Sequence, residues 1–204
     1  MEKDIFCQYD KIKEDVIYRS NHFFVKIGFG LVAAGQVMLI PLEHYDSFAE
    51  LPLEFNPEFK ELKDEITGKI TSAFSVPFMI EYGNSGTVPH AHIHFIPKRG
   101  EGYEITDVIE EMIFANKVPH LLTSREAQQR EHVRGSAYLA YEDMERYCTI
   151  PVQKDASWWK YADHRQCLTN RFGLKGIHSW KNLNEVEREL DEQKRALTRK
   201  LLRF

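Results

Sequence analysis

Long apolar runs are missing from this chain of 204 residues. No stretch approaches the roughly 20 consecutive apolar residues that a helix needs to span a bilayer, so a membrane-spanning protein is not expected. The first residues, MEKDIFCQYDK, carry charges throughout. Because a secretory signal needs an apolar segment there, we do not expect one.

Cysteine is also scarce, since the chain contains only Cys7, Cys148 and Cys167. An odd number of widely separated cysteines is not typical of a disulfide framework. We therefore expect a reduced, cytoplasmic protein.

An excess of basic residues is absent as well. Lysine and arginine number 27 against 31 aspartates and glutamates, which gives a formal net charge of −4. Proteins that follow a nucleic-acid backbone need a basic face, so a broad nucleic-acid surface is not expected. A small local anion site remains compatible with this charge. The hydrophobic content of 43% suffices for one core, with a domain of about 100–150 residues and an elaborated end.

The first hundred residues combine several strand patterns with one long helix pattern. Two β-rich stretches lie within residues 16–27, and short apolar or alternating segments at 35–42, 77–83 and 90–97 each predict a further strand. We predict an α+β fold in which an antiparallel sheet of about five strands packs against one major helix. Residues 1–100 are expected to form the catalytic domain.

The major helix is predicted over residues 57–74. Asn56 followed by Pro57 is typical of a helix start, with a capping residue before a proline in the first turn. Apolar residues then recur at helical spacing and predict a buried face: Phe59, Leu62, Ile66, Ile70 and Phe74. Ser47, with Glu50 three residues later, predicts a capping box for a short helix before it.

Residues 101–204 are expected to form a helical and hairpin extension packed on the same core. Residues 136–150 predict a hairpin, which needs a partner surface to be stable. Residues 157–172 have a helical, aromatic pattern, and we expect the three tryptophans Trp158, Trp159 and Trp180 to pack this extension. Asn184 is a capping residue for a last helix that carries four apolar residues on one face: Val186, Leu190, Leu197 and Leu201.

The segment with most chemical information is 89–97, which reads PHAHIHFIP. In a strand, its three histidines at alternating positions, His90, His92 and His94, face one side, while the apolar residues between them face a core. Such a group of imidazoles suits a metal site, or nucleophilic catalysis at phosphorus. The preceding loop offers backbone N–H groups and polar side chains for an anion, from Asn84, Ser85 and Thr87. Its alternative interpretation is an ordinary hairpin turn.

These residues resemble the histidine-triad (HIT) superfamily, whose signature is three histidines separated by apolar residues. Two further segments are similar to that family. Residues 4–7, DIFC, resemble its N-terminal Cys-Ile-Phe-Cys segment with the first cysteine replaced. Residues 35–44, GQVMLIPLEH, resemble its strand with the pattern Gly-His-x-Leu-x-Ile-Pro-x-x-His. The resemblance covers roughly residues 4–98, and the chain beyond residue 100 matches nothing in the family pattern.

The resemblance implies a nucleotide hydrolase that cleaves a P–N or P–O–P bond at the α-phosphate through a phosphohistidine intermediate. His92 would be the nucleophile, and His94 would bind a phosphate oxygen or the leaving group. Thr87 matches a phosphate-binding Ser or Thr of related members. The resemblance also implies a nucleotide or nucleotide conjugate as ligand, a homodimer formed through the helix and an adjoining strand, and catalysis without a metal.

In zinc-containing relatives a structural zinc is held by two N-terminal cysteines and two histidines. The matching residues here are Cys7, His44 and His90, while Asp4 stands where a cysteine is expected. Aspartate also ligates zinc, although structural sites use it less often. A structural zinc at these residues is therefore a hypothesis, and its alternative is that Cys7 is a small buried apolar residue.

Three positions depart from the family pattern. Gln36 stands where histidine is common, Gly28 where an Asp or Asn grips the ribose, and Gly86 where a leaving-group glutamine is common. We therefore expect a substrate other than a standard adenine dinucleotide. Three alternatives stay open: a nucleotidyl transferase, a nucleotide-binding regulatory protein with weakened turnover, and a hydrolase that uses a metal held directly by the three histidines. The sequence contains no carboxylate motif that would complete the last of these.

Overall fold

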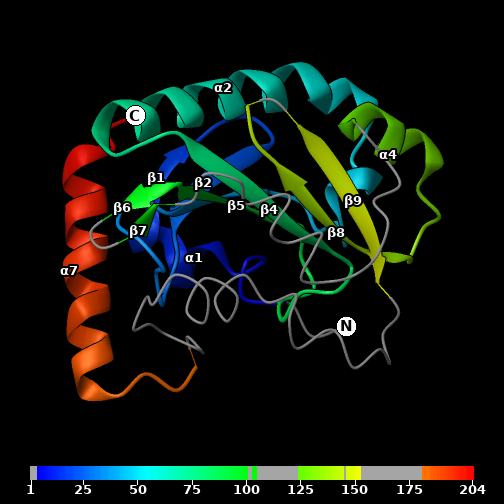
Figure 1. Cartoon of the computed structure of the whole chain (residues 1–204). Helices are drawn as coiled ribbons and strands as arrows, with labels where there is room; N and C mark the ends of the chain where they lie inside the picture. Colours follow the sequence, from blue (N-terminus) through cyan, green and yellow to red (C-terminus); the bar gives the residue numbers. More distant parts are fainter. Residues whose placement is uncertain (1–3, 101–102, 105–123, 145, 153–180) are drawn as a thin grey trace.

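A computed structural model of the chain describes residues 4–100, 103–104, 124–144, 146–152 and 181–204. The predicted helix at 157–172, the three tryptophans and Cys167 lie outside these ranges. The predicted α+β class is confirmed, and Figure 1 shows one large sheet with a long helix lying across it.

The sheet has seven strands, all antiparallel to their neighbours, in the order β1-β2-β3-β5-β4-β8-β9. Its strands are β1 (Val16–Arg19), β2 (Phe23–Ile27), β3 (Val37–Pro41), β4 (Pro77–Gly83), β5 (Ile93–Pro97), β8 (Ala137–Glu142) and β9 (Tyr147–Val152). A separate pair consists of β6 (Arg99–Gly100) and β7 (Tyr103–Glu104). The prediction of about five strands was too low, because β8 and β9 add to the same sheet beside β4.

The described helices are α1 (Tyr9–Ile12), α2 (Asn56–Ala73), α4 (Arg125–Glu131) and α7 (Glu185–Leu201), with 3₁₀ turns at Lys13–Asp15, Phe48–Glu50 and Leu53–Phe55. The periodicity of α2 is confirmed, since its buried residues are Phe59, Leu62, Ile66 and Ile70. Its predicted cap was wrong. Phe55 is the capping residue because a 3₁₀ turn runs directly into the helix, and the side chain of Asn56 bonds Gln129 of α4 instead.

The capping box predicted at Ser47 and Glu50 is also absent, because the Ser47 side chain makes no cap hydrogen bond. The Glu50 carboxylate instead accepts from the Gly135 backbone N–H and contacts the His132 ring. Asn56 and Glu50, which were expected to cap local helices, therefore bond the second part of the chain instead.

The sheet buries apolar side chains on both faces. On the α2 face, Phe23, Val25 and Ile27 of β2 join the main core, together with Ile93 and Phe95 of β5. On the opposite face, a smaller cluster contains Phe6, Ile12, Phe24, Met38 and Ile40. All five residues of β2 are buried as a result, although alternation alone would bury only one side of a strand.

The predicted hairpin near residues 136–150 is confirmed as β8 and β9, and its partner surface is β4. A buried charged cluster ties this hairpin to the rest of the sheet. The Arg125 guanidinium contacts Glu81 of β4 at 2.9 Å and Glu142 of β8 at 3.0 Å. The sheet thus continues across residue 100, and the division of the chain at that point stays a prediction.

The last helix begins as predicted, since Asn184 and Glu187 form a capping box. Its four predicted apolar residues do share one face, but all four are exposed. The side chains that the helix buries are Asp191 and Thr198. None of the helices in the described ranges is long and apolar enough to cross a membrane.

Candidate functional site

The histidine segment is only partly a strand. The sequence predicts a strand over 90–97, but β5 begins at Ile93, so only His94 lies within it. The reason is local hydrogen bonding: the His90 N–H bonds Val88, and the Ala91 N–H bonds Tyr45, instead of a neighbouring strand. The alternation survives this change, because Ala91, Ile93 and Phe95 all enter the main core and the three histidines do not.

His92 is buried, with 9% of its surface exposed, and its Nδ1 lies 2.7 Å from the carbonyl oxygen of His90. A carbonyl oxygen only accepts, so Nδ1 carries the proton and donates it, and Nε2 keeps its lone pair. Burial lowers the pKa of His92 below its ordinary value of 6.5. The ring is therefore neutral near pH 7, with one nitrogen held and the other nucleophilic.

His94 lies beside His92, with the two ring centroids 5.0 Å apart in an edge-to-face arrangement. Its Nδ1 faces the side-chain nitrogen of Gln36 at 3.5 Å, a long contact. The Gln36 amide has a fixed orientation, because its oxygen accepts from the Val32 backbone N–H at 2.8 Å. The amide nitrogen therefore donates to Nδ1 of His94, which places the proton of this ring on Nε2.

The loop before the histidines contacts the His92 ring through Gly86. A Cβ added at Gly86 would lie 3.5 Å from Cε1 of His92, an ordinary van der Waals distance, so Gly86 lies directly beside the ring. Thr87 follows on this loop and is exposed. The structure thus places Gly86 beside the nucleophile that the sequence predicts, with Thr87 next along the loop.

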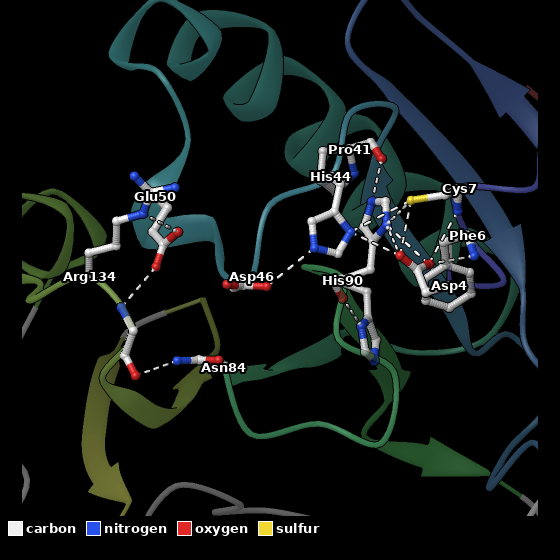
Figure 2. A network of polar contacts seen from close by, with 12 residues as sticks. Asp4, Phe6, Cys7, Pro41, His44, Asp46, Glu50, Asn84, His90 and Arg134 are labelled. Atoms are coloured by element: carbon white, nitrogen blue, oxygen red, sulfur yellow. Dashed lines mark hydrogen bonds and ion pairs between the residues drawn. The ribbon is translucent and has the colours of Figure 1, made fainter. Parts of the chain in front are cut away.

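Asn84 and Ser85, by contrast, point their side chains toward the second part of the chain. The Asn84 amide donates to the carbonyl of Gly135, and the Ser85 hydroxyl donates to the carbonyl of Tyr138 at 3.3 Å. Asn84 also has a φ of 52°, in the left-handed region that asparagine tolerates better than most residues. In this arrangement the two side chains anchor the loop to β8, and Figure 2 shows Asn84 directed toward that strand.

The hypothesised metal ligands do converge. The ligand atoms of Asp4, Cys7, His44 and His90 all lie within 4.8 Å of one another. The Asp4 carboxylate is 2.9 Å from Nδ1 of His44 and 3.0 Å from the sulfur of Cys7, and Figure 2 shows the four side chains facing one another. One oxygen, one sulfur and two nitrogens form a donor set that suits a tetrahedral zinc.

The outer contacts of the two histidines also suit a metal. Nε2 of His90 lies 3.0 Å from the carbonyl of Pro41, and Nε2 of His44 lies 3.3 Å from the Asp46 carboxylate. Protons on these outer nitrogens leave both Nδ1 lone pairs directed at Asp4, and histidines that ligate metals have this arrangement. Burial opposes ionisation of Asp4, but the Cys7 thiol, His90 and two backbone N–H groups outweigh it and lower its pKa to about 2. The fourth position is therefore a carboxylate that fits a cation.

Sequence reasoning missed several residues of this site. Gln36 was treated as a departure, although its amide sets the tautomer of His94. Asp46 carries a weak signal, as an acid two residues after His44, whereas the backbone carbonyls of Pro41 and His90 carry none. Gly28, another departure from the family pattern, is buried beside Met38, and a Cβ at this position would lie 3.4 Å from the end of the Met38 side chain.

Comparison with known proteins finds similarity among solved structures. A HIT family protein from Bacillus anthracis is 25% identical, with a TM-score of 0.44 over 52% of this chain and 81% of that one. A zinc-bound histidine triad family protein from Mycobacterium smegmatis is 18% identical, with a TM-score of 0.39 over 62% of this chain and 87% of that one. The chain is similar in structure to HIT proteins.

A diadenosine triphosphate hydrolase from Plasmodium falciparum, solved in complex with cyclomarin A, is a third such structure. It is 20% identical, with a TM-score of 0.39 over 58% of this chain and 71% of that one. No protein-family model and no curated protein matches the chain. The HIT resemblance indicated by the motifs is thus met again among solved structures, over about half of the chain.

Proposed function

We propose that this protein is a HIT-type nucleotide hydrolase that cleaves a P–N or P–O–P bond at an α-phosphate, with His92 as the nucleophile. The observation that carries the proposal is the pair of hydrogen-bond partners of two adjacent histidines, which assign opposite tautomers to the rings. The hydrogen bond to His90 leaves Nε2 of His92 with a lone pair, and the contact with Gln36 places a proton on Nε2 of His94. Neighbouring rings thus offer a nucleophile and a hydrogen-bond donor for the leaving group, a pair that suits displacement at phosphorus.

In the proposed reaction, Nε2 of His92 attacks the α-phosphorus and a P–N bond forms as the bond to the leaving group breaks. The leaving group departs with the electron pair of that bond, is stabilised by a hydrogen bond from Nε2–H of His94, and takes its proton from water. The His92 ring becomes cationic in the intermediate, and the carbonyl of His90 stabilises it by accepting from Nδ1. Water then attacks the phosphorus and gives its proton to solvent. The P–N bond breaks with its electron pair returning to Nε2 of His92, which releases the nucleotide and neutral His92.

The Gly86–Thr87 segment is the proposed site for the phosphoryl oxygens, through its backbone and the exposed Thr87 hydroxyl. A donor aimed at charge that develops in the transition state is commonly worth about 3–4 kcal/mol. Asn84 and Ser85 were expected to bind phosphate directly. Because their side chains bond β8, we propose that they act by holding the loop in place.

We also propose that Asp4, Cys7, His44 and His90 hold a structural zinc. Zinc would supply a fixed link between the N-terminal segment and the residues just before β5. Because the carbonyl of His90 orients His92, a ligand role for the His90 ring would also hold the nucleophile in place. No step of the proposed reaction uses the metal.

The direct test is a substrate panel of dinucleoside polyphosphates, nucleoside phosphoramidates and nucleotide sugars, run with and without chelator. Wild-type protein is quenched during turnover of the best substrate and analysed by mass spectrometry. We expect a nucleotidyl adduct on the peptide that contains His92. An adduct on another residue, or activity that vanishes on chelation while the fold survives, would contradict the proposal.

A further inference from the structure

Helix α7 is attached to the body of the protein through polar groups. Asp191 accepts from the Leu31 N–H at 2.7 Å, and the Thr198 hydroxyl accepts from the Gly35 N–H at 2.8 Å. Lys194 donates to the carbonyls of Leu31 and Val32. A surface helix normally turns its apolar stripe to the core and its polar side to water. On α7, by contrast, polar side chains face the body of the protein.

The apolar residues of α7 form an exposed stripe at helical spacing. Its members, here called the α7 stripe, are Val186, Leu190, Leu197 and Leu201, with exposed fractions of 66%, 44%, 43% and 43%. At 1.5 Å per residue the stripe is about 22 Å long. Figure 1 shows α7 at the side of the molecule, along the edge of the fold.

The stripe is symmetric about its own centre. Val186 and Leu201 lie equally far along the helix from the midpoint between Gln193 and Lys194, and so do Leu190 and Leu197. A two-fold interface requires a surface that is complementary to itself, with each residue meeting its counterpart across the axis. If two copies of α7 pack antiparallel, Val186 meets Leu201 of the second copy and Leu190 meets its Leu197.

The charges of α7 are divided in a way that suits the same pairing. Residues 185–192 contain five acids and one arginine, whereas residues 193–204 contain five basic residues and no acid. Asp191, Lys194, Arg195 and Arg199 contact the body of the same molecule, so the remaining charges are the ones that can face a second copy. The helix dipole accounts for acids in the first turn and bases in the last turn, but not for Glu189 and Glu192 farther along. In an antiparallel pair the acidic half of each helix lies beside the basic half of the other. Glu189 and Lys200, exposed on one flank of the stripe, then meet across the interface.

We propose that the α7 stripe is the contact surface of a symmetric homodimer in which two α7 helices pack antiparallel. This surface differs from the helix and adjoining strand that the HIT resemblance implies. In that part of the sheet, β4 is paired on both sides, with β5 and β8. Two helices of this length bury an area at the low end for specific interfaces, below about 1,200 Å² in total. The dimer is therefore weak and its population depends on protein concentration.

The test uses the full chain in sedimentation velocity over a wide range of concentrations. We expect a reversible monomer–dimer equilibrium for the wild type. Leu190→Glu with Leu197→Glu should give monomer throughout, at an unchanged melting temperature, because both side chains are exposed. Glu189→Lys should weaken the dimer severalfold, and adding Lys200→Glu should restore it, because the reversed pair is again complementary. A wild type that is monomeric at every concentration would overturn the proposal, as would a dimer that the leucine substitutions leave unchanged.

Cross-linking distinguishes the antiparallel arrangement from any other contact between copies. Gln193 lies next to the proposed two-fold axis, so Gln193→Cys should form a disulfide-linked dimer readily. Val186→Cys is the matched control, since residue 186 lies on the stripe but far from its own counterpart in the antiparallel arrangement, whereas a parallel pair would bring the two together. Equal cross-linking of the two variants, or preferential cross-linking of the control, would contradict the antiparallel pairing. Nucleotide hydrolysis plays no part in either readout.

Discussion

The carbonyl oxygen of His90 accepts a hydrogen bond from Nδ1 of His92 at 2.7 Å, while the His90 ring faces Asp4 and Cys7. One residue therefore belongs to two sites, with its backbone at the nucleophile and its side chain at the metal-ligand cluster. The ring of Phe6, two residues after Asp4, also lies edge-to-face with both imidazoles, with centroids 5.7 Å from His90 and 5.4 Å from His92. Changes in the cluster are thus expected to reach the nucleophile through the backbone.

Removal of the nucleophile should abolish turnover. We expect His92→Ala to reduce kcat to background while product nucleotide still binds, because the phosphate-binding loop remains. His94→Ala and Thr87→Ala each remove one donor, so they should lower kcat by about 10²–10³-fold and stay measurable. Steady-state kinetics and isothermal titration with product check this ranking. Full activity of His92→Ala on an authentic substrate would contradict the assignment.

Gln36 should set the tautomer of His94. In Gln36→Met the side chain keeps its approximate size but loses the amide that contacts Nδ1. We expect nitrogen NMR of the wild type to show His94 protonated at Nε2, and a mixture of tautomers in the variant. Turnover should fall, by less than in His94→Ala, because part of the population still donates. An unchanged tautomer in Gln36→Met would show that another group fixes the ring.

Zinc should copurify with the protein at the Asp4 cluster. Chelation should lower the melting temperature, because a metal that binds only the folded state stabilises it by about 4 kcal/mol at a thousandfold excess over Kd. Cys7→Ser and His44→Ala should lose the metal, whereas Asp4→Cys should retain it and bind it more tightly. Elemental analysis and thermal unfolding with and without chelator measure these effects. Wild-type protein without metal and without a response to chelator would contradict the hypothesis.

The sequence predicted the arrangement of the three histidines better than it predicted the contacts around them. Strict alternation in 90–96 was enough to separate the buried Ala91, Ile93 and Phe95 from the histidines, because burial alternates even where strand hydrogen bonds are missing. The motif at 35–44 likewise predicted that His44 lies with Asp4, Cys7 and His90. These successes rest on local patterns, which a single sequence contains.

The contacts that sequence reasoning missed join segments far apart in the chain. Asn84 has polar neighbours in its own loop, and nothing local indicates that its partner is Gly135, 51 residues away. The α7 stripe shows the same difficulty: its spacing predicts an apolar face, but only the structure shows that Asp191 and Thr198, not the leucines, are buried. Periodicity identifies a face and does not identify what covers it.

The buried charged cluster at β8 should make stability fall in acid. Burial opposes the ionisation of Glu142, but Arg125 and Lys63 outweigh it and lower its pKa. A carboxyl whose pKa is lower in the folded state stabilises the fold above its unfolded pKa, about 4.3, and loses this contribution as pH falls through the folded pKa. We expect the free energy of unfolding to decline below about pH 4 for this reason.

Glu142→Gln should be less stable by about 3 kcal/mol at neutral pH, because Arg125 loses a buried partner, and its decline in acid should be shallower. Denaturant unfolding at several pH values checks this, and parallel pH profiles for both proteins would contradict it.

Asn84 should act by holding the phosphate-binding loop on β8, and its left-handed backbone allows a controlled test. Asn84→Gly removes the amide bond to Gly135 but tolerates a φ of 52° without strain. Asn84→Ala removes the same bond and adds roughly 1–2 kcal/mol of backbone strain. If the amide bond positions the loop, both variants should lose activity, with the larger loss for alanine. If only the backbone conformation matters, Asn84→Gly should retain wild-type kinetics while Asn84→Ala is impaired. Melting temperatures measured alongside kcat and KM separate a displaced loop from a general loss of stability, since the pairing of β8 with β4 does not involve residue 84.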